Sequence, residues 1–334
     1  MSFTVLTNVL PQLSAEQVHA ALPWPALFEA LTAAFTVPPV APVRTAHAMS
    51  AADTLLLMPA WNATAIGIKL VTVIPTAIAH GGHTVDASYL LMDRQTGAPR
   101  ALLDGEALTV RRTAATSALA ARAMANANPT TLLVVGTGRL APWMARAYCA
   151  LFPSLQRVLI WGRDPLLATR VAGALLAEGI PASPVLGEPF SPGEALRGAV
   201  QSADIVSCVT TASTPVVFGD WLQEGVHVDL VGGFTPGMRE VDNEAAARSR
   251  IVVDSLDSAL KEAGDLVQPL ADGVITREAV VGELGALLRG EIMARQDPRD
   301  ITLFKSVGHA LEDLAGALLA LSIHDTSHAS SGTS

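Results

Sequence analysis

Aromatic residues make up only 4% of this chain of 334 residues, and charged residues only 16%, although half of the residues are hydrophobic. So high an apolar content is not typical of intrinsic disorder, and the length allows two domains with cores that must be largely aliphatic. The net charge of −9 provides no surplus of basic residues to neutralise phosphates. The composition therefore argues against a nucleic-acid partner.

Long hydrophobic runs and cysteines are also scarce. No uninterrupted apolar run reaches the roughly 18–20 residues that a membrane-spanning helix needs. The first residues, MSFTVLTNVL, have no basic segment of the kind that begins a signal peptide. The two cysteines, Cys149 and Cys208, fit neither a disulfide framework nor a metal motif. We therefore expect a cytoplasmic protein with no membrane segment.

The first third of the chain mixes helical and strand patterns, which predicts an α+β domain. A helix is expected after Ser14, because Gln17 three residues later completes a capping-box pattern. Strands are expected at 54–61, 65–75, 88–97 and 98–105, with a hairpin turn around Gly97. A connecting helix is expected at 109–125.

From residue 131 onward, apolar strand patterns alternate with helical ones. Strands are expected at 131–136, 157–162, 203–210, 227–232 and 249–254. Asp164 and Pro165 are typical of a helix start, and Gly179 of a helix end. This alternation predicts a doubly wound parallel sheet, and so an α/β protein. We expect the segment 303–324 to be helical and 326–334 to be a polar tail.

A glycine pattern opens the α/β half of the chain. Gly136-x-Gly138-x-x-Ala141 directly follows an apolar strand and begins a helix. The glycines allow a tight turn and close approach of a pyrophosphate, while Ala141 lets helix and strand pack closely. The alternative is a glycine-rich turn without a ligand, but the strand and helix around it favour a dinucleotide site.

The end of the next strand bears on the choice of nicotinamide cofactor. NAD-specific sites usually carry an acidic residue here to bind the ribose 2′-hydroxyl, whereas an arginine suits the 2′-phosphate of NADP. This sequence has Gly162 and Arg163, followed by Asp164. We predict NADPH as the cofactor; the alternative is that Asp164 binds the hydroxyl and NADH is used.

Several cations stand among apolar residues in the first domain. They are Arg44, Lys69, Arg111 and Arg112. A lysine within a run as apolar as AIGIKLVTVIP is rarely buried without a partner, and Arg and Lys together suit a substrate carboxylate. The alternatives are a surface-loop arginine at 44 and an edge-strand lysine at 69 whose amine reaches solvent. No HExxH or similar metal spacing occurs, so no metal is expected.

Taken together, several stretches resemble the ornithine cyclodeaminase/mu-crystallin family. They are KLVTVIP, LLMDRQTGAPRALLDGEALTVRRTAATSALAAR, VVGTGRLA, IWGRDP and FKSVGHALEDLA. The resemblance implies a Rossmann domain at 118–304 and a substrate-binding domain made of 1–117 and 305–325. It also implies a homodimer formed through the substrate-binding domain.

The family's functional residues can be carried over by position. Arg44, Lys69 and Arg112 match its contacts to the substrate carboxylate. The positions that match cofactor or nicotinamide contacts are Thr113, Ser117, Gly136, Gly138, Arg139, Leu140, Thr210, Val231, Lys305 and Ser306.

One position departs from the cyclodeaminase pattern. Cyclodeaminases of this family have an Asp after the paired glycines, which serves the substrate amine, and this chain has Phe234. The sequence FTPGMRE is instead similar to the family's ketimine reductases. The resemblance therefore implies NAD(P)H-dependent reduction of Δ1-pyrroline-2-carboxylate to L-proline and of Δ1-piperideine-2-carboxylate to L-pipecolate, with Phe234 against the substrate ring.

In that reaction hydride passes to the imine carbon, and Lys69 is the expected proton donor or relay. Three alternatives are an alanine-type amino-acid dehydrogenase, an ornithine cyclodeaminase and a non-catalytic NADPH-dependent binding protein for small ligands.

Overall fold

The computed structural model describes residues 10–187 and 193–331. Residues 1–9, where no signal peptide is expected, lie outside the described residues, as do residues 332–334 of the expected tail. The chain divides into two compact units. Unit 1 comprises the residues up to 30, 38–112 and those from 310 onward, and unit 2 comprises 31–37 and 113–309. The domain boundaries at 117/118 and 304/305 remain predictions.

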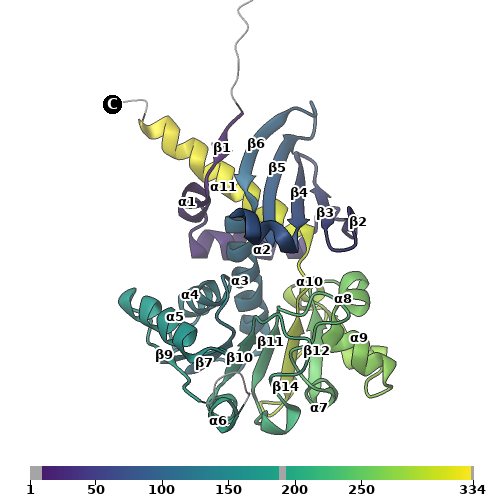
Figure 1. Cartoon of the computed structure of the whole chain (residues 1–334). Coiled ribbons are helices and arrows are strands. Elements are labelled where there is room, and N and C mark those ends of the chain that lie inside the picture. Colours follow the sequence, from purple (N-terminus) through teal and green to yellow (C-terminus); the bar gives the residue numbers. More distant parts are fainter. Residues whose placement is uncertain (1–9, 188–192, 332–334) are drawn as a thin grey trace, which may run out of the picture. The chain divides into compact units, whose positions relative to one another are not determined.

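Unit 1 is built on a six-stranded sheet with the order β1-β6-β5-β4-β3-β2 (Figure 1). Strands β2 to β6 pair antiparallel in succession, and β1 runs parallel to β6. The strands are β1 (Gln12–Leu13), β2 (Thr45–Ala48), β3 (Thr54–Trp61), β4 (Ala65–Val73), β5 (Val85–Asp93) and β6 (Pro99–Asp104). The helical elements with residues in this unit are α1 (Ala15–Ala20), α2 (Trp24–Thr36), η1 (Pro75–His80), α3 (Gly105–Met124) and α11 (Ala310–Ser331).

Short-range sequence signals fix several of these boundaries. Ser14 and Gln17 form the predicted capping box at the start of α1. Gly97 adopts a φ of 71° in the predicted hairpin turn, and the Asp93 carboxylate accepts the N–H groups of Gln95 and Thr96 there. Strand β5 therefore ends at Asp93, whereas the prediction extended it to residue 97.

Helix α3 begins four residues earlier than the predicted start at 109. The Asp104 carboxylate accepts the N–H of Ala107 at 2.7 Å, which satisfies one of the free donors of the first turn. The helix passes from unit 1, which contains its residues 105–112, into unit 2.

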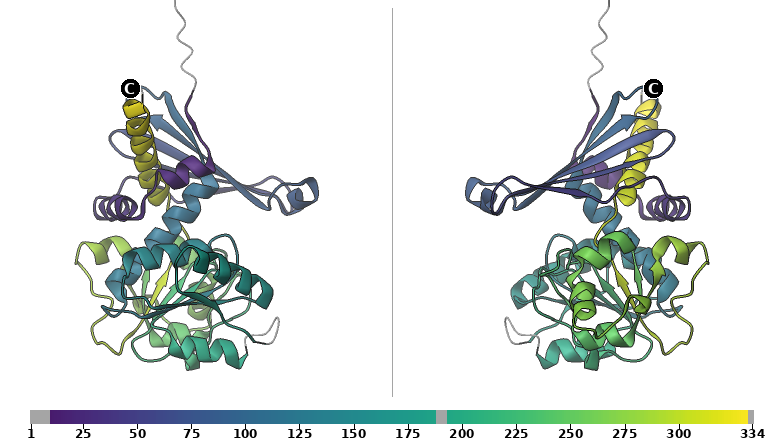
Figure 2. Two further views of the ribbon diagram at one scale, coloured as in Figure 1. Left: turned by 90° about the vertical axis from the view of Figure 1, so that its left-hand side faces the viewer. Right: turned by 90° about the vertical axis from the view of Figure 1, so that its right-hand side faces the viewer.

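Helix α11 packs on β3, β4 and β5 (Figure 2). Burial alternates along β4, so that Ala65, Gly67, Lys69 and Val71 are buried on one face. Lys69 therefore lies in an interior strand with its side chain directed into the packed face, which excludes the solvent-reaching edge-strand alternative.

Unit 2 has an eight-stranded sheet in which every pairing is parallel. The order is β13-β12-β14-β11-β10-β7-β8-β9. The strands are β7 (Thr131–Val135), β8 (Arg157–Trp161), β9 (Ala182–Pro184), β10 (Ile205–Cys208), β11 (His227–Leu230), β12 (Ser249–Val253), β13 (Val280–Glu283) and β14 (Ile301–Lys305). The order reverses between β7 and β10, as at the ligand-binding switch point of Rossmann folds.

Helical segments connect these strands (Figures 1 and 2). They are α4 (Ala141–Leu151), α5 (Pro165–Ala177), α6 (Glu194–Ser202), η2 (Gly219–Trp221), α7 (Asn243–Arg248), α8 (Leu256–Glu262), α9 (Gly264–Ala271), η3 (Arg277–Ala279) and α10 (Leu284–Leu288). The predicted α/β class, with a Rossmann unit and a second α+β unit, is confirmed.

The helix predicted for 303–324 is wrong in its first residues. Ile301–Lys305 forms the fully buried strand β14 between β11 and β12, and α11 begins only at Ala310. A short apolar run buried on both faces has no period of its own, so it reads as part of the helical pattern that follows. Helix α11 then continues to Ser331, through most of the segment expected to be a polar tail.

In the described part of the chain, no helix is both long enough and apolar enough to cross a membrane.

We expect Gly105→Ala to destabilise the protein, because a Cβ at this position would lie 2.7 Å from the backbone carbon of Ala87. Overpacking against backbone should cost about 1–3 kcal/mol of unfolding free energy. Gly198→Ala in α6 is the control, since a Cβ there meets nothing within 4 Å. This substitution should stabilise the protein by up to about 1 kcal/mol, because alanine favours the helix over glycine. Urea unfolding of both variants tests this, and equal stabilities would contradict it.

Candidate active site

The glycine turn after β7 borders a cavity of about 780 Å³ in unit 2. Gly136 has a φ of 132°, which other residues rarely adopt, and a Cβ there would lie 2.8 Å from the carbonyl oxygen of Val209. At Gly138 a Cβ would meet nothing within 4 Å, so the backbone faces open space. Leu140 precedes α4, and no side chain caps the start of this helix. The turn therefore fits a pyrophosphate.

Arg163 and Asp164 have different roles at the end of β8. The exposed Arg163 lines the cavity. Asp164 also borders it, but its Oδ1 accepts the N–H of Leu166 at 2.9 Å and caps α5, as the sequence predicts. Because that carboxylate already has a structural partner, the arginine is the more available of the two groups for a ribose substituent.

The segment 209–216 forms another wall of the cavity, and a buried carboxylate holds it. Oε1 of Glu240 accepts the N–H of Thr210 at 2.7 Å and its hydroxyl at 2.9 Å, while Oε2 accepts the N–H of Gly232 at 2.8 Å. Glu240 thus links the beginnings of the two loops that follow β10 and β11. Burial raises the pKa of Glu240, and the charge of Lys305 opposes that rise.

The paired glycines at 232–233 leave room for this buried acid and for a second one. A Cβ at Gly232 would clash with the carbonyl oxygen of Thr210 and lie 2.5 Å from Oε1 of Glu240, and a Cβ at Gly233 would lie 2.7 Å from Oδ2 of Asp265. Asp265 itself accepts the N–H of Glu240 at 2.7 Å and the amine of Lys305 at 3.0 Å. Larger residues at 232 and 233 would therefore displace a carboxylate network that organises the loop.

Phe234 directly follows the paired glycines and is 42% exposed. The loop 231–238 contains no acidic residue. The carboxylates beneath it, Glu240 and Asp265, are buried and hydrogen-bonded to backbone N–H groups. The group that the loop presents to solvent at this position is therefore a phenyl ring and not an acid.

Asp229 is a third buried acid of unit 2, two residues before Val231. It accepts hydrogen bonds from the hydroxyls of Ser117 (3.0 Å), Tyr148 (3.0 Å) and Ser207 (2.7 Å). Burial raises its pKa to about 6, although these three hydrogen bonds oppose the rise. Ser117 is thereby fixed to β11, and the N–H of Val231 donates to Cys208 and prolongs the pairing of β11 with β10.

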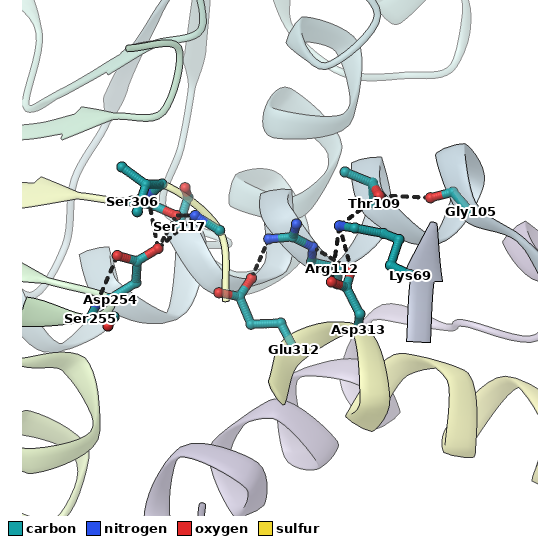
Figure 3. Close-up of polar contacts among 12 residues, drawn as sticks. Lys69, Gly105, Thr109, Arg112, Ser117, Asp254, Ser255, Ser306, Glu312 and Asp313 are labelled. Carbon is teal, nitrogen blue, oxygen red and sulfur yellow. Dashed lines mark hydrogen bonds and ion pairs between the residues drawn. The ribbon is translucent and has the colours of Figure 1, made fainter. Parts of the chain in front are cut away.

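Ser306 and Thr113 are also buried in unit 2. The Ser306 hydroxyl donates to Oδ2 of Asp254 at 2.9 Å, and the same oxygen accepts the N–H groups of Val307 and Gly308 (Figure 3). Asp254 therefore fixes the turn that follows β14.

Lys69 and Arg112 come together in unit 1 on one carboxylate (Figure 3). The Lys69 amine lies 3.0 Å from Oδ1 and 2.9 Å from Oδ2 of Asp313, and Nε of Arg112 lies 3.0 Å from Oδ1. Nη1 of Arg112 also donates to Glu312 at 2.7 Å. Thr109 accepts a longer hydrogen bond of 3.4 Å from Lys69. We call Lys69, Arg112, Glu312 and Asp313 the charge cluster; at most 3% of each residue is exposed.

Burial and the neighbouring guanidinium act together on Lys69. Desolvation, followed by the positive charge of Arg112, lowers the pKa of Lys69 to about 8, although Asp313 and Glu312 oppose this. Burial alone would raise the pKa of Asp313, but the charges of Arg112 and Lys69 outweigh it and hold that pKa below its usual value. The cluster thus holds a lysine whose protonation changes near neutral pH, a property typical of functional sites.

Arg44 directly precedes β2 and lies outside the paired strands. Thr45 pairs with Leu57 on β3, whereas the preceding bridge joins Val40 to Trp61, so the register shifts between residues 40 and 45. Arg44 is partly exposed, unlike the other two predicted cations.

The functional side chains that the sequence reading missed are the acids. The sequence predicts that Lys69 and Arg112 contact a substrate carboxylate, and the structure pairs them with Glu312 and Asp313. Both acids lie in the quoted motif FKSVGHALEDLA, and Glu240 ends the quoted segment FTPGMRE. An adjacent acidic pair inside an otherwise apolar helix was the available signal, because such a pair is rarely buried without cations.

Over residues 10–187 and 193–331, no group of three or more His, Cys, Asp or Glu side chains is placed to hold a metal ion.

The chain is similar in sequence to known proteins. The model of the ornithine cyclodeaminase/mu-crystallin family matches residues 13–329. The Δ1-pyrroline-2-carboxylate reductase of Colwellia psychrerythraea is 35% identical over 311 residues, which cover 91% of this chain and 96% of that protein.

Two solved structures extend the similarity to three dimensions. The Δ1-pyrroline-2-carboxylate reductase of Thermococcus litoralis, in complex with NADH and L-proline, aligns with a TM-score of 0.86 and 32% identity over 94% of this chain and 97% of that one. An archaeal alanine dehydrogenase dimer with bound NAD aligns with a TM-score of 0.87 and 26% identity over 96% and 97% of the two chains. With its fold, its glycine turn and a family match over nearly its whole length, this chain belongs to the ornithine cyclodeaminase/mu-crystallin family.

Proposed function

We propose that this chain is an NAD(P)H-dependent reductase of cyclic ketimines. The proposed substrates are Δ1-pyrroline-2-carboxylate, reduced to L-proline, and Δ1-piperideine-2-carboxylate, reduced to L-pipecolate. Its relatives in Colwellia psychrerythraea and Thermococcus litoralis carry the name of the first activity. A homodimer and a cytoplasmic location are part of the proposal, and the dimeric alanine dehydrogenase supports the former.

The observation that carries the substrate class is Phe234. Release of ammonia from a diamino acid needs an acid or base at the substrate amine. The loop after the paired glycines presents a phenyl ring instead, and the nearby Glu240 and Asp265 are bonded to backbone N–H groups. An apolar side chain suits the methylene groups of a ring that has no free amine.

The residues of unit 2 fit the cofactor. Gly136 and Gly138 provide the turn and the open backbone for the pyrophosphate, and Arg163 provides a cation for a 2′-phosphate. Arg139 and Leu140 continue the turn, while Val231 and Thr210 follow the carboxyl ends of the parallel strands β11 and β10. The bound cofactor supplies the hydride.

The residues of unit 1 fit the substrate carboxylate. Arg112 can offer planar N–H donors and Lys69 a point charge, and Arg44 is the third proposed contact. In this proposal they hold the carboxylate so that one face of the C=N bond is presented for reduction, which by positioning alone can contribute several kcal/mol. Lys69 is the proposed proton donor or relay.

An alanine-type dehydrogenase is the second candidate, because the archaeal alanine dehydrogenase aligns over nearly the whole chain. It would use the same cofactor turn and the same cations, but its substrates are a keto acid and ammonia.

The proposed function predicts that five- and six-membered cyclic imines drive oxidation of NADPH without added ammonia. The assay compares both imines with pyruvate plus ammonia and with ornithine, using NADPH and NADH in turn. Turnover of pyruvate only when ammonia is present, with no turnover of either ring, would instead assign the alanine-type activity. Ammonia release from ornithine would assign cyclodeamination.

We expect Lys69→Met to lower kcat/KM for the cyclic imine at least about 100-fold, because one charged contact to the carboxylate is lost. In the parent protein, binding of pyrrole-2-carboxylate should weaken above about pH 8, as Lys69 loses its proton. The lysine is charged below its pKa and neutral above it, so the weakening occurs on the alkaline side.

The variant should not show this pH dependence, which separates a direct role of Lys69 from a structural one. Arg94→Met, at an exposed turn of the same unit, is the control for loss of a positive charge and should leave both measurements unchanged. An equal pH dependence in Lys69→Met and parent would rule out the assigned role.

We expect Arg163→Ala to raise the KM for NADPH about tenfold and to leave the KM for NADH nearly unchanged, since only NADPH carries the 2′-phosphate. Steady-state kinetics with both cofactors test this. An equal rise in both values would show that Arg163 contacts a group common to the two cofactors, or supports the fold.

A further inference from the structure

We propose that Glu312 and Asp313 determine the charge of the substrate that is bound: by neutralising Lys69 and Arg112, they favour a zwitterionic iminium carboxylate over an anionic imine. The inference rests on the proposed function, since it specifies the protonation state in which a cyclic ketimine is bound. It also assigns a specificity role to two acids of α11.

The charge cluster contains two cations and two carboxylates. Asp313 contacts both cations, and Glu312 contacts Arg112 from the neighbouring position on α11 (Figure 3). All four side chains are almost completely removed from solvent. Before any ligand binds, the formal charge of the cluster is therefore zero.

A buried site tolerates a change of net charge poorly, because a charge that is taken out of water loses its hydration. An imine carboxylate with an uncharged nitrogen would make the neutral cluster negative. The corresponding iminium carboxylate carries one charge of each sign and adds none. The zwitterion is therefore the form that the charge cluster accommodates at the smallest electrostatic cost.

The two acids also remove an electrostatic conflict within the reaction. Two unpaired cations beside the substrate would disfavour a positive charge on the ring nitrogen. With Glu312 and Asp313 in place, that repulsion is offset, and the iminium is the better hydride acceptor. Hydride adds to the ring carbon, the C=N π electrons become the nitrogen lone pair, and the cofactor is oxidised. The resulting amine then takes up a proton, for which Lys69 is the proposed donor or relay.

Two groups that the structure places directly beside Lys69, apart from Asp313, carry no charge. Tyr89 on β5 pairs with Lys69, and burial together with the charge of Asp313 holds its pKa well above the usual value, so the phenol stays neutral. Thr109 on α3 carries no charge. Arg44, which precedes β2, is partly exposed, so solvent screens its charge more strongly.

The experiment compares two ring ligands of different charge, with NADP⁺ bound to the protein. L-Proline is zwitterionic, whereas pyrrole-2-carboxylate has an uncharged ring nitrogen and is an anion. Glu312→Gln gives the charge cluster a formal charge of +1. We expect this variant to bind L-proline more weakly and pyrrole-2-carboxylate more tightly, so that the ratio of the two dissociation constants shifts at least about tenfold.

Asp313→Asn should shift the ratio in the same direction, and it provides an independent test if Glu312→Gln does not fold. The matched control is Asp325→Asn, which removes a carboxylate from an exposed position of the same helix and should leave the ratio unchanged. If the acids had only a structural role, the variants would bind both ligands more weakly to the same extent. An unchanged ratio of the two dissociation constants in folded variants overturns the proposal.

The same experiment separates the inference from the proposed function. If the ratio shifts but the parent protein reduces no cyclic imine, the charge selection stands and the assigned reaction fails. If the parent reduces cyclic imines and the ratio does not shift, the reaction stands and the charge selection fails.

Discussion

Buried charge needs a partner, and much of this chain is arranged around that constraint. In unit 1 the carboxylate of Asp313 lies against both Lys69 and Arg112. In unit 2 the amine of Lys305 donates to Asp265, which also holds the backbone at Glu240. Each pair joins residues far apart in the sequence, so that an ion pair fixes a helix against a sheet. Replacing such pairs with apolar side chains is often neutral or stabilising. Their presence is therefore better explained by function than by stability.

The segment DLVGGFTPGMRE shows how one such network shapes a loop. The glycines at 232 and 233 are needed because the carbonyl oxygen of Thr210 and the carboxylate oxygens of Glu240 and Asp265 occupy the space where a Cβ would lie. Those oxygens in turn accept N–H groups from the loops that follow β10 and β11. The two buried acids thus accept hydrogen bonds from the backbone, and the exposed side chain of this loop is that of Phe234. The same geometry explains the glycines and the absence of a reactive acid on the outer side of the loop.

The parts of the fold that could be predicted from the sequence depend on contacts only a few residues apart. The capping box of Ser14, the turn at Gly97, the cap at Asp164 and the glycine turn at 136–138 are all of this kind. Strand β14 was mistaken for helix because its apolar residues are buried on both faces and therefore have no alternation.

The acidic half of the candidate site was missed for a related reason. Lys69 and Asp313 are 244 positions apart, and no local pattern links them. The cations could be predicted from the sequence because a charge within an apolar strand is conspicuous. The carboxylates that pair with them lie in the first turn of a helix, where acids are common for another reason, the helix dipole.

The charge balance of the cluster also bears on the choice between the two candidate reactions. An alanine-type enzyme must bring ammonia to a keto acid, form the C=N bond and release water before reduction. These steps need groups that exchange protons with an open-chain substrate and with solvent. Unit 2 instead presents Phe234 after its paired glycines, and unit 1 holds a buried cluster of formal charge zero. A ring that arrives with its C=N bond already formed, and with its two charges balanced, needs only to be held and reduced. That requirement is simpler, and it is the reason for proposing the cyclic ketimine ahead of the keto acid.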